Sequence, residues 1–274
     1  MKPVIETHTL CKSYHGRPVV DHLNLTVPQG CVYGFLGPNG AGKSTLMRII
    51  AGIYTADDGS VLINDEPVYD NPSAKTHLVF VPDRMHLTGG GATIERMANF
   101  YASCYPKFSF EKFDALLNIF KLDKKRRVRS LSKGMVRQVQ TVLALSCNAD
   151  VLLFDETFDG LDPIARNIAK RLIYRDMCGF GSTVIMTSHS LRELEDTCDR
   201  FAMLYQGKIV FQNDLADAKS QLFKVQLAFA RQVTPEDFKD VELLSFTKQG
   251  SIVYVLVRGE AAETSAKIEA LKPL

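Results

Sequence analysis

The sequence predicts an α/β fold whose core is a mostly parallel sheet, and three observations support this. The segments VLLFDE (151–156) and STVIMTSH (182–189) are short, apolar and rich in β-branched residues, with the helical pattern PIARNIAKRLIYRDM between them. This alternation is typical of buried parallel strands joined by a crossover helix. The apolar segment CVYGFL precedes a glycine-rich loop and the helical pattern STLMRIIAGIY, which ADDGS should end. The 274 residues, 46% of them apolar, can bury one large core or two modest ones.

The glycine-rich loop matches the phosphate-binding pattern G-x-x-x-x-G-K-[ST], in a strand, loop and helix context that a chance glycine-rich turn would not share. Glycines let backbone N–H groups surround a phosphate, and the start of the helix adds a favourable field. Lys43 is placed to reach the β- and γ-phosphates of a nucleotide, and Ser44 to ligate Mg²⁺. The predicted binding residues are Gly37, Pro38, Asn39, Gly40, Ala41, Gly42, Lys43, Ser44 and Thr45. They predict a P-loop NTPase core.

A site for Mg²⁺ and a nucleotide needs a second metal anchor on a neighbouring strand. The segment VLLFDE ends in Asp155 and Glu156. Asp155 is placed to hold the water shell of the metal, and Glu156 to orient or deprotonate an attacking water. A buried strand that merely ends at two acidic residues is the alternative, but the phosphate loop in the same chain favours the nucleotide site.

Three further segments carry a resemblance to a known family. Leu131–Met135 (LSKGM) resembles the L-S-G-G-Q signature of ATP-binding cassette (ABC) ATPases, residues 157–162 (TFDGLD) are similar to their D-loop, and His189 stands where their switch histidine should be. With the motifs above, the resemblance spans residues 14–189. It implies ATP and Mg²⁺ as ligands, ATP hydrolysis, and a head-to-tail dimer held together by two ATP molecules.

The signature segment can form a second anion site. Ser132 and Gly134 lie at the start of a helical pattern, where a hydroxyl, backbone N–H groups and the helix dipole attract an anion. The resemblance implies that this site receives the γ-phosphate of ATP bound to the other subunit, and that Asp162 bridges to the partner's phosphate loop. An ordinary helix N-cap is the alternative for Ser132.

The resemblance also implies roles for single residues. Glu156 is the expected general base, Asp155 a metal ligand, His189 the sensor of the γ-phosphate, and Lys43 a further catalytic group. Tyr14, in KSYHGRP, matches the aromatic residue that stacks on adenine. A structural histidine and a half-buried strand tyrosine are the alternatives.

The chain departs from the family pattern at several positions. Asp83, in VFVPDRM, stands where the family usually has a glutamine that links the metal to the membrane partner. A carboxylate can hold a Mg²⁺-bound water but cannot donate a hydrogen bond, so Asp83 is kept as a candidate metal ligand. Lys133 replaces the middle glycine of the signature, and Met135 its glutamine. The variant LSKGM resembles bacterial exporter subunits whose permease is a separate chain.

The predicted organisation is an ABC ATPase domain at 1–220 and a small α+β appendage at 221–274. The first domain begins with an antiparallel β subdomain and contains a helical signature subdomain at about 86–148, with the helical patterns TIERMANFYASCY, FEKFDALLNIF and GMVRQVQTVLALSC. In the appendage, FKVQLAFA predicts a strand, ELLSFTKQGSIVYVLVRG a hairpin turning at Lys248–Gly250, and SAKIEALKPL a last helix.

Composition narrows the expected partners and location. The formal net charge is only +2, so nothing indicates a nucleic-acid partner. Six singly placed cysteines are expected to be reduced and mostly packed thiols. No segment approaches the roughly 18 consecutive apolar residues of a membrane helix, so we expect no direct membrane insertion. The expected location is the cytoplasm, at the inner face of the cell membrane, where an integral permease would hold the chain peripherally.

The sequence therefore predicts the ATP-hydrolysing subunit of an ABC transporter, of the exporter type. It would act as a homodimer, or as a heterodimer with a related ATPase subunit, on a separate membrane permease. A non-transport ABC ATPase that acts on a soluble partner, for example in iron–sulfur assembly, is the alternative.

Overall fold

The computed structural model describes residues 2–83, 92–158, 160–214, 222–229, 233–249, 252–259 and 261–271. Contacts divide the chain into two compact units, Met1–Gln212 and Asn213–Leu274. The strands up to the boundary are β1 (Pro3–Tyr14), β2 (Arg17–Pro28), β3 (Val32–Leu36), β4 (Asp58–Ile63), β5 (Glu66–Pro67), β6 (Leu78–Val81), β7 (Val151–Asp155), β8 (Thr183–Ser188), β9 (Arg200–Tyr205) and β10 (Lys208–Asp214). The helices are α1 (Lys43–Ile50), α2 (Pro72–Thr76), α3 (Ile94–Cys104), α4 (Phe110–Phe120), α5 (Lys133–Ser146), α6 (Pro163–Phe180) and α7 (Leu191–Glu195), with a 3-10 turn η1 (Val128–Ser130).

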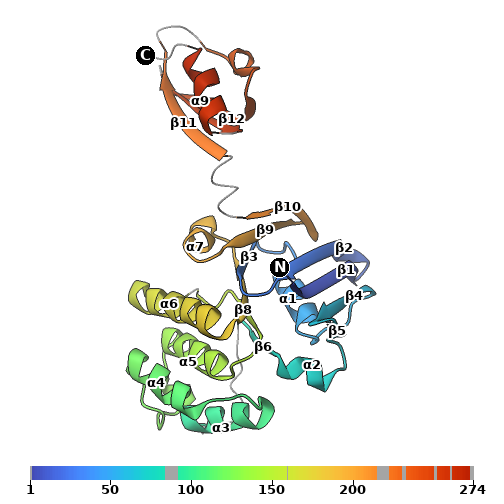
Figure 1. The fold of residues 1–274 in the computed structure, drawn as a ribbon, viewed down its shortest axis with the longest axis vertical. Coiled ribbons are helices and arrows are strands. Elements are labelled where there is room, and N and C mark those ends of the chain that lie inside the picture. The colour runs from blue at the N-terminus through green and yellow to red at the C-terminus, as the bar shows by residue number, and fades with distance from the viewer. Residues whose placement is uncertain are drawn as a thin grey trace. The chain divides into compact units, whose positions relative to one another are not determined.

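A six-stranded sheet, in the order β10-β9-β3-β8-β7-β6, forms the centre of the first unit (Figure 1). Strands β6, β7, β8, β3 and β9 pair in parallel, which confirms the predicted parallel core. The observed β7 and β8 differ from the predicted segments by a single residue at their ends. In a parallel sheet the carboxyl ends of β3, β7 and β8 share one edge, where ligands of such folds bind.

Side chains of this sheet alternate between two hydrophobic cores on opposite faces. On β7, Leu152 and Phe154 belong to one core, and Val151 and Leu153 to the other. Helices α5 and α6 cover the first face, which we call the α5 face (Figure 1). Helix α1 and the N-terminal strands cover the second, the α1 face. The direction of a side chain along each strand therefore decides which helix it meets.

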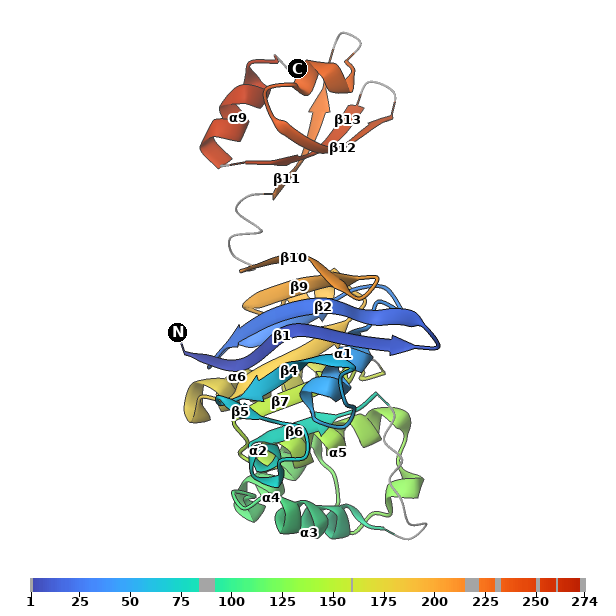
Figure 2. The same cartoon turned by 90° about the vertical axis from the view of Figure 1, so that its right-hand side faces the viewer.

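The predicted N-terminal β subdomain is a four-stranded antiparallel sheet in the order β2-β1-β4-β5. Figure 2 shows β1 and β2 in front of α1 and the central sheet. The turn between β1 and β2 consists of His15 and Gly16, both with positive φ. Apolar residues of β1 and β2, such as Ile5 and Leu25, join the core of the α1 face together with α1.

Helix α1 ends at Ile50, before the predicted end at ADDGS. Gly52 has a φ of 62°, and a Cβ atom there would lie 2.9 Å from the Val68 carbonyl oxygen. The chain therefore turns out of the helix at this point. Ile53, which belongs to the predicted helical pattern STLMRIIAGIY, lies beyond the helix and is 52% exposed.

Helices α3, α4 and α5 form the predicted helical region between β6 and β7. Each begins where a side chain caps it: the hydroxyls of Thr93, Ser109 and Ser132 accept a backbone N–H from the residue three positions on. Their buried faces join the core of the α5 face. The predicted start of this region, residue 86, lies outside the described residues. Over the ranges given above, no helix combines the length and apolar character needed to cross a bilayer.

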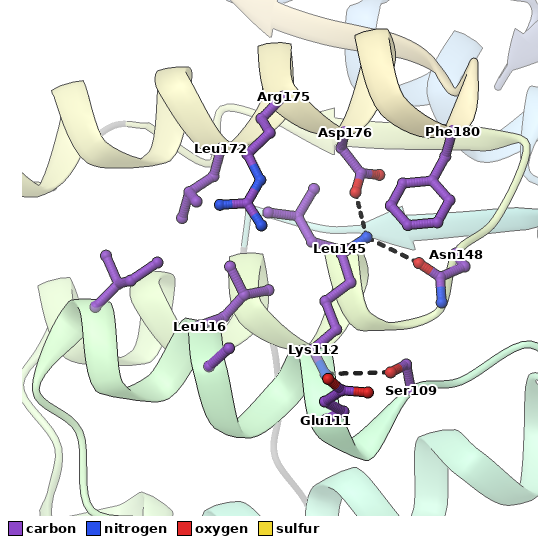
Figure 3. Close-up of a pocket in the computed structure, with 12 residues that line it drawn as sticks. Ser109, Glu111, Lys112, Leu116, Leu145, Asn148, Leu172, Arg175, Asp176 and Phe180 are labelled. Carbon is purple, nitrogen blue, oxygen red and sulfur yellow. Dashed lines mark hydrogen bonds and ion pairs between the residues drawn. The ribbon is translucent and has the colours of Figure 1, made fainter.

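A buried ion pair holds α4 against α6 (Figure 3). Lys112 of α4 pairs with Asp176 of α6, and its Nζ atom also donates to Asn148 Oδ1 at 2.8 Å. Asp176 Oδ2 accepts a hydrogen bond from Ser182 Oγ at 3.3 Å. The Lys112 ammonium lies 4.3 Å from the centre of the Phe180 ring, a further favourable contact.

The second unit is a three-stranded antiparallel sheet with one helix, in agreement with the predicted α+β appendage. Its strands are β11 (Leu222–Ala228), β12 (Glu242–Gln249) and β13 (Ile252–Arg258), in the order β11-β13-β12, followed by α9 (Ala261–Glu269). A 3-10 turn, η2 (Pro235–Phe238), precedes β12. The predicted hairpin is present, but its turn comes later than predicted, because Lys248 pairs with Val253 and Gln249 with Ile252 in the strands. Gly250 lies outside the described residues. Helix α9 starts four residues before the predicted Ser265.

All six cysteines lie within the described residues and are thiols that form no disulfide bond there. Cys31, Cys147 and Cys198 are buried, whereas Cys104 and Cys178 are exposed, so only half of them are fully packed as predicted. Burial raises the pKa of the Cys198 thiol, which keeps it protonated and unreactive.

Replacing Asp176 by Asn should destabilise the first unit. The Lys112 ammonium would lose its counter-charge in a largely buried site, so we expect the free energy of unfolding to fall by about 2 to 4 kcal/mol. Asp114→Asn is the matched control, because Asp114 lies on α4, pairs with Lys124 and is 49% exposed. It should change the free energy by less than about 1 kcal/mol. Urea denaturation followed by circular dichroism measures both, and equal losses would contradict the stabilising role of Asp176.

Candidate functional site

The residues predicted to bind phosphate lie at the carboxyl edge of the central sheet, between β3 and α1. Helix α1 begins at Lys43, and Gly42 before it has a φ of 102°. A Cβ atom on Gly42 would lie 2.4 Å from the Val19 carbonyl oxygen, and one on Gly37 would lie 2.5 Å from the Leu204 carbonyl oxygen. The loop therefore packs closely against the backbones of β2 and β9, and only glycine fits at these two positions.

Lys43 is buried and folds back over the loop. Its ammonium donates hydrogen bonds to the carbonyl oxygens of Gly37 (2.6 Å) and Pro38 (3.2 Å), and lies 3.8 Å from Glu156 Oε1. The positive charge is thus held between the phosphate loop and the acidic end of β7. An anion bound by the loop would lie next to this charge.

Asp155 ends β7 on the α1 face, which is why it meets α1. Its Oδ1 atom accepts hydrogen bonds from Ser44 Oγ (3.0 Å) and Thr187 Oγ1 (2.9 Å). The residue is fully buried, and among the described residues its Oδ2 atom has no hydrogen-bond partner. An unpartnered buried carboxylate oxygen beside a serine hydroxyl is the donor set that Mg²⁺ prefers, so Ser44 and Asp155 fit the predicted metal.

Glu156 follows in a strained conformation with a φ of 48°. Its backbone N–H donates to Thr187 Oγ1 at 2.9 Å, which fixes the turn. The side chain is 23% exposed and lines a pocket of about 490 Å³. The other residues that line this pocket are Tyr14, Val19, Asn39, Gly40, Ala41, Gly42, Lys43, Ser44 and Thr45. One pocket therefore brings together the predicted adenine contact, most of the phosphate loop and the predicted base.

Tyr14 reaches this pocket from the end of β1 and is exposed. The Lys12 ammonium lies 5.8 Å from the centre of its ring. One side of the ring is therefore occupied by a cation, and the exposed part can contact a planar ligand.

The predicted second anion site is apart from this pocket within one chain. Ser132, Gly134 and Asp162 are not among the residues that line the pocket. Ser132 caps α5 and accepts the Met135 N–H at 3.2 Å. A Cβ atom on Gly134 would lie 3.1 Å from the Gly160 carbonyl oxygen, so the signature segment packs closely on the loop after β7.

Asp162 caps α6. Its Oδ1 atom accepts the backbone N–H groups of Ile164 (3.0 Å) and Ala165 (2.9 Å). This local role accounts for an aspartate at the start of the helix. Asp159, part of the D-loop resemblance, lies outside the described residues.

His189 is exposed and directly follows β8. A network that sequence reasoning missed surrounds its segment: Ser188 Oγ donates to Glu193 Oε2 (2.7 Å), and Glu193 Oε1 pairs with Arg166 Nη1 (3.2 Å). Arg166 Nη2 in turn approaches the carbonyl oxygen of Phe158 at 3.5 Å. The network joins the loops that follow β7 and β8. No spacing in the sequence signals it, because its members come from separate elements.

Asp83 is not among the residues that line the pocket. Its Oδ1 atom accepts a hydrogen bond from Arg137 Nη2 of α5 at 2.6 Å. Sequence reasoning missed Arg137, since a basic residue in a helical pattern usually faces solvent.

Comparisons with known proteins place the chain in a family. A family model described as ABC transporter matches residues 20–159, just over half of the 274 residues. The ABC transporter ATP-binding protein YtrB of Bacillus subtilis (strain 168) is 27% identical over 270 residues, which cover 98% of this chain and 92% of that protein.

The Nod factor export ATP-binding protein I of Sinorhizobium fredii (strain NBRC 101917 / NGR234) is 32% identical over 213 residues, which cover 76% of this chain and 62% of that protein. A solved structure of the ATP binding subunit of an ABC transporter has a TM-score of 0.73 and 25% identity, over 79% of this chain and 92% of that one. The residues matched by the family model, 20–159, include the phosphate loop and the Asp-Glu strand. The chain therefore belongs to the family of ABC transporter ATP-binding proteins.

Proposed function

We propose that this chain is the ATP-hydrolysing subunit of an ABC exporter and drives a separately encoded membrane permease. The observation that carries the proposal is the buried Asp155 carboxylate, held by Ser44 and Thr187, with Glu156 next to it in the pocket of the phosphate loop. This arrangement supplies a metal anchor and a base on the same side of one bound nucleotide.

ATP would lie with adenine against Tyr14 and its phosphates along the loop from Gly37 to Thr45. Ser44 and Asp155 would hold Mg²⁺, which would offset charge on the phosphates. The Lys43 ammonium, released from the loop carbonyls, would contact the β- and γ-phosphates. The Asp83 carboxylate is the other metal candidate from the sequence.

Glu156 would accept a proton from the attacking water. The water oxygen forms a bond to the γ-phosphorus while the bond from that phosphorus to the β,γ-bridging oxygen breaks, so that ADP and phosphate leave. The Thr187 hydroxyl fixes the backbone of Glu156, and Lys43, 3.8 Å away, balances its charge. His189 would contact the γ-phosphate from the end of β8.

A second subunit would complete each site. Ser132 and Gly134, at the exposed start of α5, would receive the γ-phosphate of ATP bound to the partner, and Asp162 would reach the partner's phosphate loop. The separation of these residues from the pocket of their own chain supports this composite arrangement. The partner is a second copy of this chain or a related ATPase subunit, and the pair would sit on the cytoplasmic side of the membrane against the permease.

The proposal that the transporter is an exporter rests on a relative's name and on the signature segment. One similar protein is named for Nod factor export, and LSKGM resembles the signature of exporter subunits with a separate permease. Neither relatives nor charge indicate nucleic acid as a partner, since the formal net charge is only +2.

The variant Glu156→Gln should bind ATP normally and hydrolyse it at least about 10²-fold more slowly, because the base is lost while the pocket is kept. ATP should then hold it as a dimer in size-exclusion chromatography. Glu111→Gln, an exposed position on α4, is the control and should behave as the parent protein. Undiminished hydrolysis by Glu156→Gln would remove Glu156 from the mechanism.

Mixing two inactive variants tests the composite site. Ser132→Arg and Lys43→Ala should each lose hydrolysis, but a mixed dimer contains one site in which both the loop and the signature are intact. An equimolar mixture should regain about a quarter of the parent rate if subunits pair at random. A mixture that stays inactive would contradict the head-to-tail dimer.

Affinity purification from detergent-solubilised cells tests the transport function. The tagged chain should be recovered with a polytopic membrane protein, and ATP hydrolysis should change when that protein is present. Lys43→Ala is the control for contacts that need no nucleotide. Recovery with a soluble scaffold in place of a membrane protein would favour the alternative of a non-transport ATPase.

A further inference from the structure

Helix α5 carries a buried arginine whose counter-charge comes from the end of β6. Arg137 is only 2% exposed. Its Nη2 atom donates to Asp83 Oδ1 at 2.6 Å, and its Nη1 atom to the Pro82 carbonyl oxygen (3.1 Å) and Gln140 Oε1 (3.3 Å). The guanidinium thus joins the signature helix to the segment directly after β6.

Asp83 is the charged partner in this set. The other two acceptors are neutral, and a buried cation without a counter-charge is strongly disfavoured. Asp83 itself is 39% exposed, so its carboxylate is reached by water from one side and by Arg137 from the other. If Asp83 left to ligate a metal, a buried guanidinium would stay behind with only a carbonyl and an amide oxygen.

The alternation of side chains between the two faces of the sheet separates Asp83 from the metal site. On β6, Val79 and Val81 belong to the core of the α5 face. Asp83 lies two residues beyond Val81 and contacts α5 through Arg137. Asp155 follows Phe154 of the α5 face and therefore points to the opposite face, where it meets Ser44 of α1.

We propose that Asp83 is a positioning residue: it holds Arg137 and, through it, the Ser132 end of α5, instead of ligating Mg²⁺. Arg137 lies five residues after Ser132, about 7.5 Å along the helix. The ion pair therefore fixes the end of the helix that carries the second anion site. The effect on ATP-dependent dimers rests on the function proposed above, whereas the effect on α5 itself does not.

Asp83→Asn, Arg137→Met and the double variant test this proposal by hydrogen exchange of the hydrogen-bonded amides of Leu131, Met135 and Val136. Both single variants should lower the protection of these amides, Asp83→Asn by about tenfold or more because the buried guanidinium loses its counter-charge, and Arg137→Met because the contact itself is removed. The double variant, which leaves no unpaired charge, should lose no more than either single variant. Asp114→Asn, an exposed ion-pair position on α4, is the control and should leave these amides unchanged. Unchanged protection in Asp83→Asn, or additive losses in the double variant, would overturn the proposal.

The Mg²⁺ requirement separates positioning from metal binding. Asp155→Asn should raise the Mg²⁺ concentration for half-maximal ATP hydrolysis by about tenfold or more, whereas Asp83→Asn should leave it within about twofold of the parent value.

In the Glu156→Gln background, Asp83→Asn and Arg137→Met should weaken the ATP-dependent dimer equally. If Asp83→Asn shifts the Mg²⁺ requirement as Asp155→Asn does, Asp83 is a metal ligand. If Glu156→Gln alone forms no dimer with ATP, the proposed function fails, while the hydrogen-exchange result still decides the role of Asp83.

Discussion

The buried carboxylate of Asp155 is the interaction on which the site depends. It accepts hydrogen bonds from Ser44 of α1 and Thr187 of β8, so it fixes the start of α1 against two strands of the sheet. A buried carboxylate without such donors would be strongly disfavoured, and these three elements must therefore keep their positions. The Thr187 hydroxyl acts twice, because it donates to Asp155 and accepts the backbone N–H of Glu156. One side chain of β8 thus positions both acidic residues.

The alternation of side chains along the strands explains how one sheet serves two purposes. The α1 face holds the phosphate loop, Ser44 and Asp155, and the α5 face holds the helices that carry the signature segment. Asp83 and Asp155 are both acidic residues at the ends of neighbouring strands, and both were grouped as metal candidates from the sequence. The structure gives Asp83 a contact on the α5 face and Asp155 contacts on the α1 face.

Sequence reasoning succeeded where the signal is local. Strands β7 and β8 have short apolar runs, and the phosphate loop has its glycines, lysine and serine at a recognisable spacing. It failed where the cause is distant in sequence. The early end of α1 is the exception, because Gly52, with a φ of 62°, is a local signal for a helix end. The Arg137 contact joins residues 54 positions apart. Such contacts depend on packing, which a local pattern does not contain.

Among the described residues, two ion pairs with a buried member attach the helical region to the rest of the first unit. Arg137 joins α5 to the segment after β6, and Lys112 joins α4 to Asp176 of α6. The apolar sides of α4 and α5 also pack in one hydrophobic core with β6, β7 and α6. A movement that breaks either ion pair leaves a buried group without its counter-charge, either Arg137 or Asp176. Movement of the signature segment relative to the nucleotide pocket is therefore opposed by these contacts unless a ligand or partner replaces one of them.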